Sequence, residues 1–192
     1  ASQGVTTQKS GNEGALVYIM DGEGCQDDYK ITIKGINNAL LDAENFAKFF
    51  ASNGDLYLRI EDVELINGKT TKSGGAFFFY ESILELDNCK ISNCSTTYTS
   101  SPESLTGIYM CGTSVLEMTN TTCKNSIYLY ATTATIGSNC TIGTTNLEAT
   151  DGFITLDSSS TLKLDGENIF INKPIYVKHR EKKKKIGDDY SH

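Results

Sequence analysis

The sequence contains no tryptophan, only two prolines (Pro102 and Pro174) and only two histidines (His179 and His192) among its 192 residues. No run of 18 consecutive apolar residues occurs, which excludes a transmembrane helix within this sequence. No Cys-x-x-Cys pair occurs, and the ligand spacing of a structural zinc site is therefore missing. No P-loop or nucleophile elbow is present either. From this inventory we predict no cofactor, no metal site and no catalytic residue.

Positive charge is scarce over most of the chain. Residues 1–172 hold ten Lys or Arg against 21 Asp or Glu, whereas residues 173–192 hold seven against three. The overall net charge of −7 argues against a nucleic-acid partner. The basic run Lys182–Lys185 has two interpretations, a solvated tail or a patch close to a membrane or a partner. We expect one domain over residues 1–172 and a basic C-terminal extension over 173–192.

Serine and threonine are abundant, with 39 residues between them, and glycine reaches 17. Such a composition favours strands and turns over helices. Five segments share one pattern, in which apolar residues take the first and third positions, a polar turn follows, and Asn or Gly often comes at the tenth. These segments start at Leu58, Leu84, Leu116, Ala134 and Leu162, and residues 31–36, which start at Ile31, are a candidate earlier copy.

The starts are separated by 27, 26, 32, 18 and 28 residues. This spacing is too short and too strand-like for βαβ units, and too irregular for propeller blades. It indicates coils of a parallel β-solenoid, an all-β fold in which no coil can bury its inner face alone. Equivalent residues should then stack, with Leu58, Leu84, Leu116 and Leu162 in one inward ladder and Leu86 beside Ile60. Recurrent turn asparagines should form amide ladders.

Two segments depart from this repeat pattern. Residues 40–51 have some helical spacing, but the flanking sequence favours a strand and a turn. Residues 95–104, nearly all Ser, Thr and Tyr, are expected to form a loop between coils.

One stretch resembles a known family. Residues 63–77 contain Gly74-Gly75-Ala76-Phe77, and residues 84–93 follow with Leu-Glu-Leu-Asp-Asn-Cys-Lys-Ile-Ser-Asn. They resemble the polymorphic outer-membrane-protein-like repeats, which carry a Gly-Gly-Ala-apolar motif. The resemblance covers about residues 15–172. In composition and in its cysteines the sequence is more similar to members from protists than to bacterial ones. It implies a right-handed parallel β-helix of the pectin-lyase-like class, here of about five to six coils, with an adhesive role.

The same fold class also includes enzymes that act on polysaccharides, so a catalytic site must be considered. Polygalacturonases of this class need several Asp, a His and an Arg-x-Lys, but Arg59 is the only Arg before residue 173 and both His lie in the extension. Asp62, Asp87 and Asp165 recur near one place in the repeat, either as solvated turn carboxylates or as a weak calcium site. The aromatic stretches Phe77–Tyr80 and Tyr128–Tyr130 should each point half of their rings into the core, and outward rings would suit sugar binding.

The predicted function is therefore a non-enzymatic structural or adhesive β-solenoid. It would present faces and loops to protein partners in a larger assembly, or to glycans. The alternative is a carbohydrate-active enzyme or a glycan-binding module of the pectin-lyase-like class.

Cysteines and glycosylation sequons decide the expected location. Sequons occur at Asn93, Asn120 and Asn139. Six cysteines allow three disulfides, and stacking favours pairs among Cys89, Cys94, Cys111, Cys123 and Cys140, with Cys25 left free. The alternative is that all are buried, reduced thiols. We expect an extracellular or cell-surface protein, and the alternative is an intracellular structural assembly.

Overall fold

The structure is a computed structural model that describes residues 15–20, 29–97, 106–146 and 152–178. In these ranges the chain forms 19 β-strands and no helix. Every strand pairing among the described residues is parallel, as in β4 with β7 and β10 with β13. The all-β prediction is therefore confirmed, and the parallel pairing is compatible with a β-solenoid.

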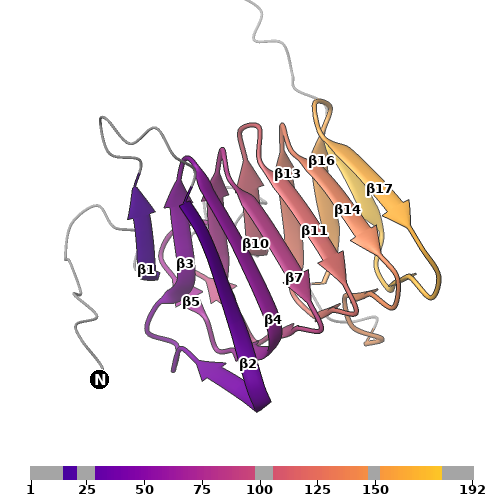
Figure 1. Cartoon of the computed structure of the whole chain (residues 1–192). Helices are drawn as coiled ribbons and strands as arrows, with labels where there is room; N and C mark the ends of the chain where they lie inside the picture. Colours follow the sequence, from indigo (N-terminus) through magenta and orange to yellow (C-terminus); the bar gives the residue numbers. More distant parts are fainter. Residues whose placement is uncertain (1–14, 21–28, 98–105, 147–151, 179–192) are drawn as a thin grey trace, which may run out of the picture.

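The first large sheet has seven strands. Each strand pairs with the one that follows it after about one repeat of the sequence (Figure 1). In spatial order its strands are β1 (Ala15–Met20), β3 (Lys48–Asn53), β6 (Phe77–Tyr80), β10 (Thr106–Cys111), β13 (Ser126–Tyr130), β16 (Ile154–Asp157) and β19 (Ile175–Lys178).

The second large sheet has ten strands and is strongly curled, because the long strand β4 pairs with β7 along its first half and with β8 along its second half. Its first row consists of β2 (Tyr29–Asp42), β4 (Leu56–Ile66), β7 (Ile83–Asp87), β11 (Val115–Thr119), β14 (Thr133–Gly137) and β17 (Thr161–Asp165). Its second row continues with β8 (Lys90–Ser92), β12 (Thr122–Cys123), β15 (Thr141–Ile142) and β18 (Phe170–Ile171).

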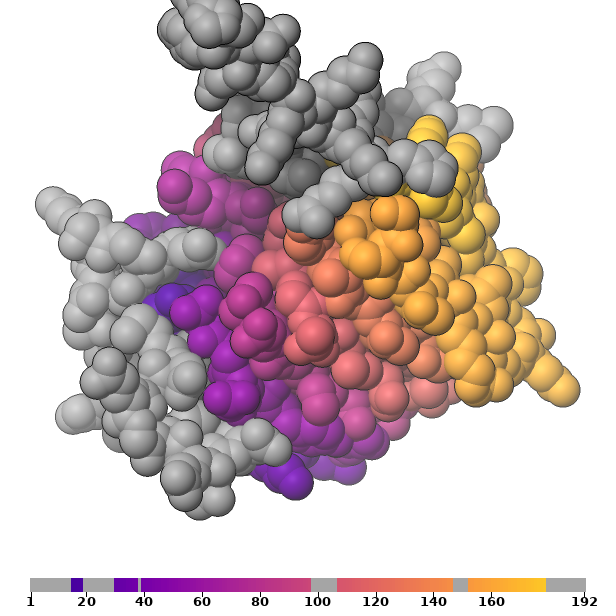
Figure 2. Space-filling view, turned by 90° about the horizontal axis from the view of Figure 1, so that it is seen from above, coloured from indigo at the N-terminus to yellow at the C-terminus, as the bar shows by residue number. Residues whose placement is uncertain are grey.

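We call one pass of the chain through both large sheets a layer. Successive layers lie side by side in sequence order, so that the colours of Figure 1 run from indigo to yellow across the molecule. Figure 2 shows the same progression on the surface. A small third sheet joins β5 (Lys69–Thr70) and β9 (Ser95–Thr96).

The core lies between the sheets and consists of apolar side chains stacked from layer to layer. Leu58, Leu84 and Leu116 are register partners and are fully buried. The ladder continues through Ala134 to Leu162, and Leu86 lies opposite Ile60. The predicted inward ladder is confirmed, because alternation along each strand sends every second side chain inward.

The two segments that depart from the repeat pattern, residues 40–51 and 95–104, have different structures. Residues 40–51 form the end of β2, a turn and the start of β3, which confirms the strand-and-turn prediction. The predicted loop over 95–104 begins instead with the short strand β9, and its residues 98–104 lie outside the described residues. The seven-stranded sheet continues past residue 172 through β19. Lys182–Lys185 also lie outside the described residues.

Candidate functional site

A bulge in β2 creates the main irregularity of the ten-stranded sheet. The pairing of β2 with β4 runs as far as Lys34 opposite Glu61 and resumes at Ala39 opposite Val63. Residues 35–38 therefore lie opposite the single residue Asp62. A β-bulge of this kind re-aims side chains and is common beside functional sites.

Gly35 fixes the base of the bulge. A Cβ atom at this position would lie 2.1 Å from the carbonyl oxygen of Asp62, so only glycine permits the close approach of the two strands. Asn37 and Asp62 both adopt the left-handed region, with φ of 56° and 59°. Asn and Asp are the non-glycine residues that tolerate this conformation best.

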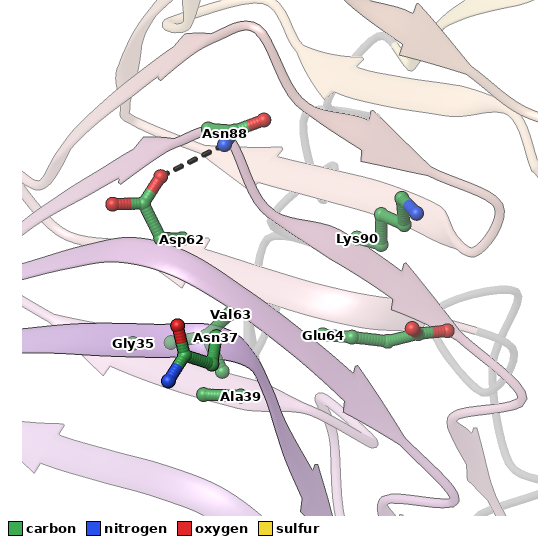
Figure 3. Close-up of a pocket in the computed structure, with 8 residues that line it drawn as sticks. All are labelled: Gly35, Asn37, Ala39, Asp62, Val63, Glu64, Asn88 and Lys90. Atoms are coloured by element: carbon green, nitrogen blue, oxygen red, sulfur yellow. Dashed lines mark hydrogen bonds between the residues drawn. The ribbon is translucent and has the colours of Figure 1, made fainter.

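A cavity of about 580 Å³, which we call the bulge pocket, lies beside the bulge. Figure 3 shows Asn37 from β2, Asp62 and Glu64 from β4, and Asn88 and Lys90 from the next layer around it. Small apolar groups, from Ala39 and the buried Val63, complete the lining. Because hydrogen-bond donors and acceptors from three layers line this cavity, the bulge pocket is the candidate binding site.

Charged and polar groups of both signs lie around the bulge pocket. Asn88 Nδ2 donates a hydrogen bond of 2.8 Å to Asp62 Oδ1, and Lys34 Nζ lies 4.0 Å from Asp62 Oδ2. Lys34 also donates to Glu61 at 3.0 Å, which raises the pKa of Lys34. Glu64 lies opposite Lys90 on the adjacent strand. The pocket thus offers both hydrogen-bond donors and hydrogen-bond acceptors.

The turn asparagines of successive layers form an asparagine ladder, consisting of Asn88, Asn120, Asn139 and Asn168. All four have positive φ between 50° and 58°. The Nδ2 atoms of Asn139 and Asn168 donate to the Oδ1 atoms of Asn120 and Asn139 at 3.0 and 3.1 Å. Asn120 Nδ2 donates to Asp87 Oδ1 at 2.9 Å. The predicted amide ladder is confirmed.

A charge cluster on the outer face of the ten-stranded sheet surrounds Arg59. Its guanidinium donates to Glu61, Glu85 and Asp87 at 2.5, 2.7 and 3.5 Å. These contacts raise the pKa of Arg59 and lower that of Glu61. Because the partners come from two adjacent strands, the cluster links layers laterally.

The three recurrent carboxylates do not converge. Asp87 and Asp165 occupy the same ladder but are separated by Thr119 and Gly137 in the intervening layers. Asp62 lies in the adjacent turn. Among the described residues, no group of three or more His, Cys, Asp or Glu could hold a metal ion.

Three stacked rings on the outer face of the seven-stranded sheet form an aromatic ladder: Phe78, Tyr109 and Tyr128. Their ring centroids are 5.5 and 5.2 Å apart and their planes differ by 12°. Lys48 Nζ lies 5.0 Å from the centroid of Phe78, and Lys178 Nζ lies 5.1 Å from that of Tyr128. Ring faces are thus covered by neighbouring rings or by ammonium groups.

The aromatic ladder corrects one sequence expectation. Phe77 and Phe79 are buried in the core, as half of that stretch should be. In Tyr128–Tyr130, however, Leu129 points inward and both tyrosines belong to the outward register positions. The reason is the parity of the strand, since two residues of the same parity share a face.

The predicted disulfides are absent from the described part of the chain. The five candidates are buried free thiols: Cys89, Cys94, Cys111, Cys123 and Cys140. Cys123 lies opposite Ile91 and Ile142, and Cys111 lies opposite Tyr80 and Tyr130.

The other candidates are likewise separated from one another. The backbone N–H of Cys94 donates to Asn125 Oδ1 in the next layer, and Thr121 separates Cys89 from Cys140. No two of these cysteines are register neighbours in adjacent layers. Cys25 lies outside the described residues.

The three sequon asparagines are exposed. Asn120 and Asn139 use their Nδ2 atoms within the asparagine ladder. Asn93 has a positive φ of 55° and no side-chain hydrogen bond within the described part of the chain. Of the three, Asn93 is the amide with no competing contact.

Sequence reasoning missed Asn37, Glu64, Asn88 and Lys90 as pocket residues. The signal available in the sequence was an insertion after the first strand of the repeat. Leu41 follows Ile31 by ten residues, whereas the equivalent Leu65 follows Leu58 by seven. It also missed a row of hydroxyl side chains directly before β7, β11, β14 and β17. There Ser82 N donates to Ser114 Oγ, and Thr132 N donates to Ser160 Oγ.

Comparisons with known proteins add no relatives. No protein-family model, no curated protein and no solved structure matches this sequence or its structure. Within the described residues there is also no helix with the length and apolar character needed to span a membrane.

Proposed function

We propose that this protein is a non-enzymatic structural or adhesive segment, built as a right-handed parallel β-helix of about five to six coils. It would present its faces and loops to protein partners or glycans within a larger cell-surface or extracellular protein or assembly. The layered parallel sheets support the β-helix, because each of the first six strands of one sheet is followed by a strand of the other.

The observation that carries the proposal is that the outer faces are linked from layer to layer by their own side chains. Arg59 bridges two strands, the asparagine ladder joins successive turns, and the aromatic ladder joins three layers. Such lateral links stiffen a solenoid, in which each layer contacts only its neighbours. A stiff rod with polar faces is suited to presenting surfaces rather than to closing around a reaction.

Further support for a non-enzymatic role comes from the groups that a polysaccharide-cleaving enzyme would use. Arg59 is held by three carboxylates, and Asp87 also accepts a hydrogen bond from Asn120. Asp62, Asp87 and Asp165 lie apart. No pair of carboxylates with separate acid and base environments is therefore assembled from the predicted acids.

The second candidate is a glycan-binding module, and the bulge pocket is the observation that favours it. By contrast, the aromatic ladder does not support sugar stacking, because its ring faces are already covered. A sugar would therefore be held by hydrogen bonds at the pocket. This alternative differs from the first in requiring a saturable small-molecule site.

The extracellular location remains part of the proposal. Exposed sequons at Asn93, Asn120 and Asn139 support it. The free thiols give it no support, and they fit the alternative of an intracellular structural assembly.

Incubation of the full chain with polygalacturonate and with a neutral polysaccharide tests the non-enzymatic role. We expect no increase in reducing ends and no unsaturated products, with a commercial pectate lyase as the positive control. Any cleavage that disappears in an Asp62→Asn variant would contradict the proposal. A crystal structure tests the handedness, and a left-handed winding would overturn the β-helix assignment made above.

A further inference from the structure

We propose that the bulge pocket is a binding site for a neutral saccharide, which it holds without cleaving. The inference rests on the proposed function and names the site and ligand class through which the protein would contact glycans.

The first argument is that the bulge pocket exists because the repeat is broken there. The strand β4 makes its turn with the single residue Asp62, and the next layer makes the equivalent turn with Asn88. In β2 the same turn takes residues 35–38. These extra residues form a wall that the two following layers lack. A local departure from an otherwise consistent fold is where a functional site is expected.

The second argument is the chemistry of the lining. Carboxylate oxygens of Asp62 and Glu64 accept hydrogen bonds, Lys90 donates them, and the amide of Asn37 does both. A sugar hydroxyl also donates and accepts, so it can satisfy either kind of group.

Charge narrows the ligand class further. Lys34 lies 4.0 Å from Asp62, and Lys90 is the register partner of Glu64, so the site carries charged groups of both signs. A neutral polyhydroxyl compound fits these neighbours best.

The lining also excludes ligands that need a flat stacking surface. No aromatic side chain is among the residues around the bulge pocket, so a nucleobase would find no ring to stack on. Ala39 offers a small apolar contact of the kind that the C–H groups of a pyranose can use.

The third argument is that the pocket is held in shape before a ligand arrives. Gly35 locks the bulge against Asp62, and Asn88 holds the Asp62 carboxylate at 2.8 Å. Asn37 occupies a left-handed conformation at the bulge. Groups that are already ordered lose little conformational entropy on binding.

The test is an NMR titration of the full, isotopically labelled chain with D-galactose, D-mannose and N-acetyl-D-glucosamine. We expect at least one of these sugars to shift the amide signals of Asn37, Asp62 and Asn88 in a saturable manner. D-galacturonate and D-glucosamine, which carry opposite charges, should bind about tenfold more weakly than the neutral sugar.

Matched variants distinguish an effect on sugar binding from an effect on folding. Asn37→Gly keeps the positive φ and removes the amide, and it should weaken binding about fivefold. Asn93→Gly makes the same change in another turn, outside the pocket lining, with φ of 55° and an exposed amide, and it should leave the affinity unchanged. Both variants should melt as cooperatively as the wild type.

Three results would overturn the site proposal: no saturable shift with any of the three neutral sugars, tightest binding of a charged sugar, or unchanged affinity in Asn37→Gly. In each case the proposed structural role would stand. Release of free sugar from a bound oligosaccharide would instead contradict the non-enzymatic proposal, while leaving the pocket as the place of binding.

Discussion

At the scale of single residues, Asp157 shows how a buried carboxylate is satisfied by its own turn together with the adjacent layer. Its side chain accepts hydrogen bonds from the backbone of Ala131 at 3.0 Å and from the hydroxyls of Ser159 and Ser160 at 2.5 and 2.7 Å. The residue is only 7% exposed. Burial alone would raise its pKa, but the hydrogen bonds prevail and lower it below the ordinary value of 3.8.

This arrangement predicts a pH-dependent contribution to stability. Since the folded-state pKa of Asp157 is lowered, its contribution is present above the ordinary pKa of 3.8 and is lost as the pH falls through the folded-state pKa. Asp157→Asn should cost about 2 kcal/mol of unfolding free energy at pH 7 and much less near pH 2. Urea denaturation at both pH values measures this. An equal loss at both would show that charge is not involved.

At the scale of elements, the aromatic ladder joins β6, β10 and β13 on the outside of the seven-stranded sheet. Tyr109 is its central ring and stacks on both neighbours. Each aromatic pair contributes about 0.5–1.5 kcal/mol beyond the area that it buries. The ladder is therefore a lateral brace across three layers.

Replacing the central ring tests the brace. Tyr109→Ala should lower the unfolding free energy by about 2 kcal/mol, because it removes both stacking contacts. Tyr109→Phe keeps the ring and should cost clearly less. Thermal melting followed by circular dichroism compares the two. A Phe variant as unstable as the Ala variant would assign the effect to the hydroxyl.

The stacked row of core side chains that contains Leu86 allows burial to be compared between an inner and an outer layer. Leu86 is 1% exposed, whereas its ladder equivalent Leu164 in β17 is 51% exposed. Leu86→Asp should destabilise the protein by at least about 4 kcal/mol, since it places a charge in the core. Leu164→Asp should cost less than about 1 kcal/mol, as surface substitutions usually do. Equal melting temperatures for the two variants would refute the register.

At the scale of the whole molecule, the reactivity of the buried thiols measures how readily the stacked layers open. Burial raises the pKa of Cys89 to about 11 and that of Cys94 to about 12. Thiolate is the reactive form, so both should react slowly with alkylating reagents at pH 8 in the native state.

Mass spectrometry of a Cys25→Ser variant measures this protection. We expect no modification of the five remaining thiols during brief labelling of the native protein and five modified thiols after denaturation without reductant. Disulfide-linked peptides in an unreduced digest, or rapid native labelling, would contradict the structure. Five free thiols would also weaken the case for an extracellular location.

The candidate site was less predictable than the fold. Gly35 and the neighbouring Asn37 were visible as turn formers, but their role depends on Asp62 one layer away and on Asn88 and Lys90 two layers away. Contacts of this kind follow from stacking and not from local sequence. The predicted disulfide pairs were wrong for the same reason. Proximity in sequence did not reveal that Thr121 separates Cys89 from Cys140.

The sequence by itself determined the strands, their inward faces and the order of the layers. Alternation of residues such as Leu84 and Leu86 is local and directly visible, because side-chain parity in a strand needs no tertiary information. The tertiary structure alone decided which polar groups meet across layers, including the partners of Arg59, the capped aromatic ladder and the bulge pocket. Turns of different length absorb the variable spacing of the repeats, so the lateral register is set by packing of the core.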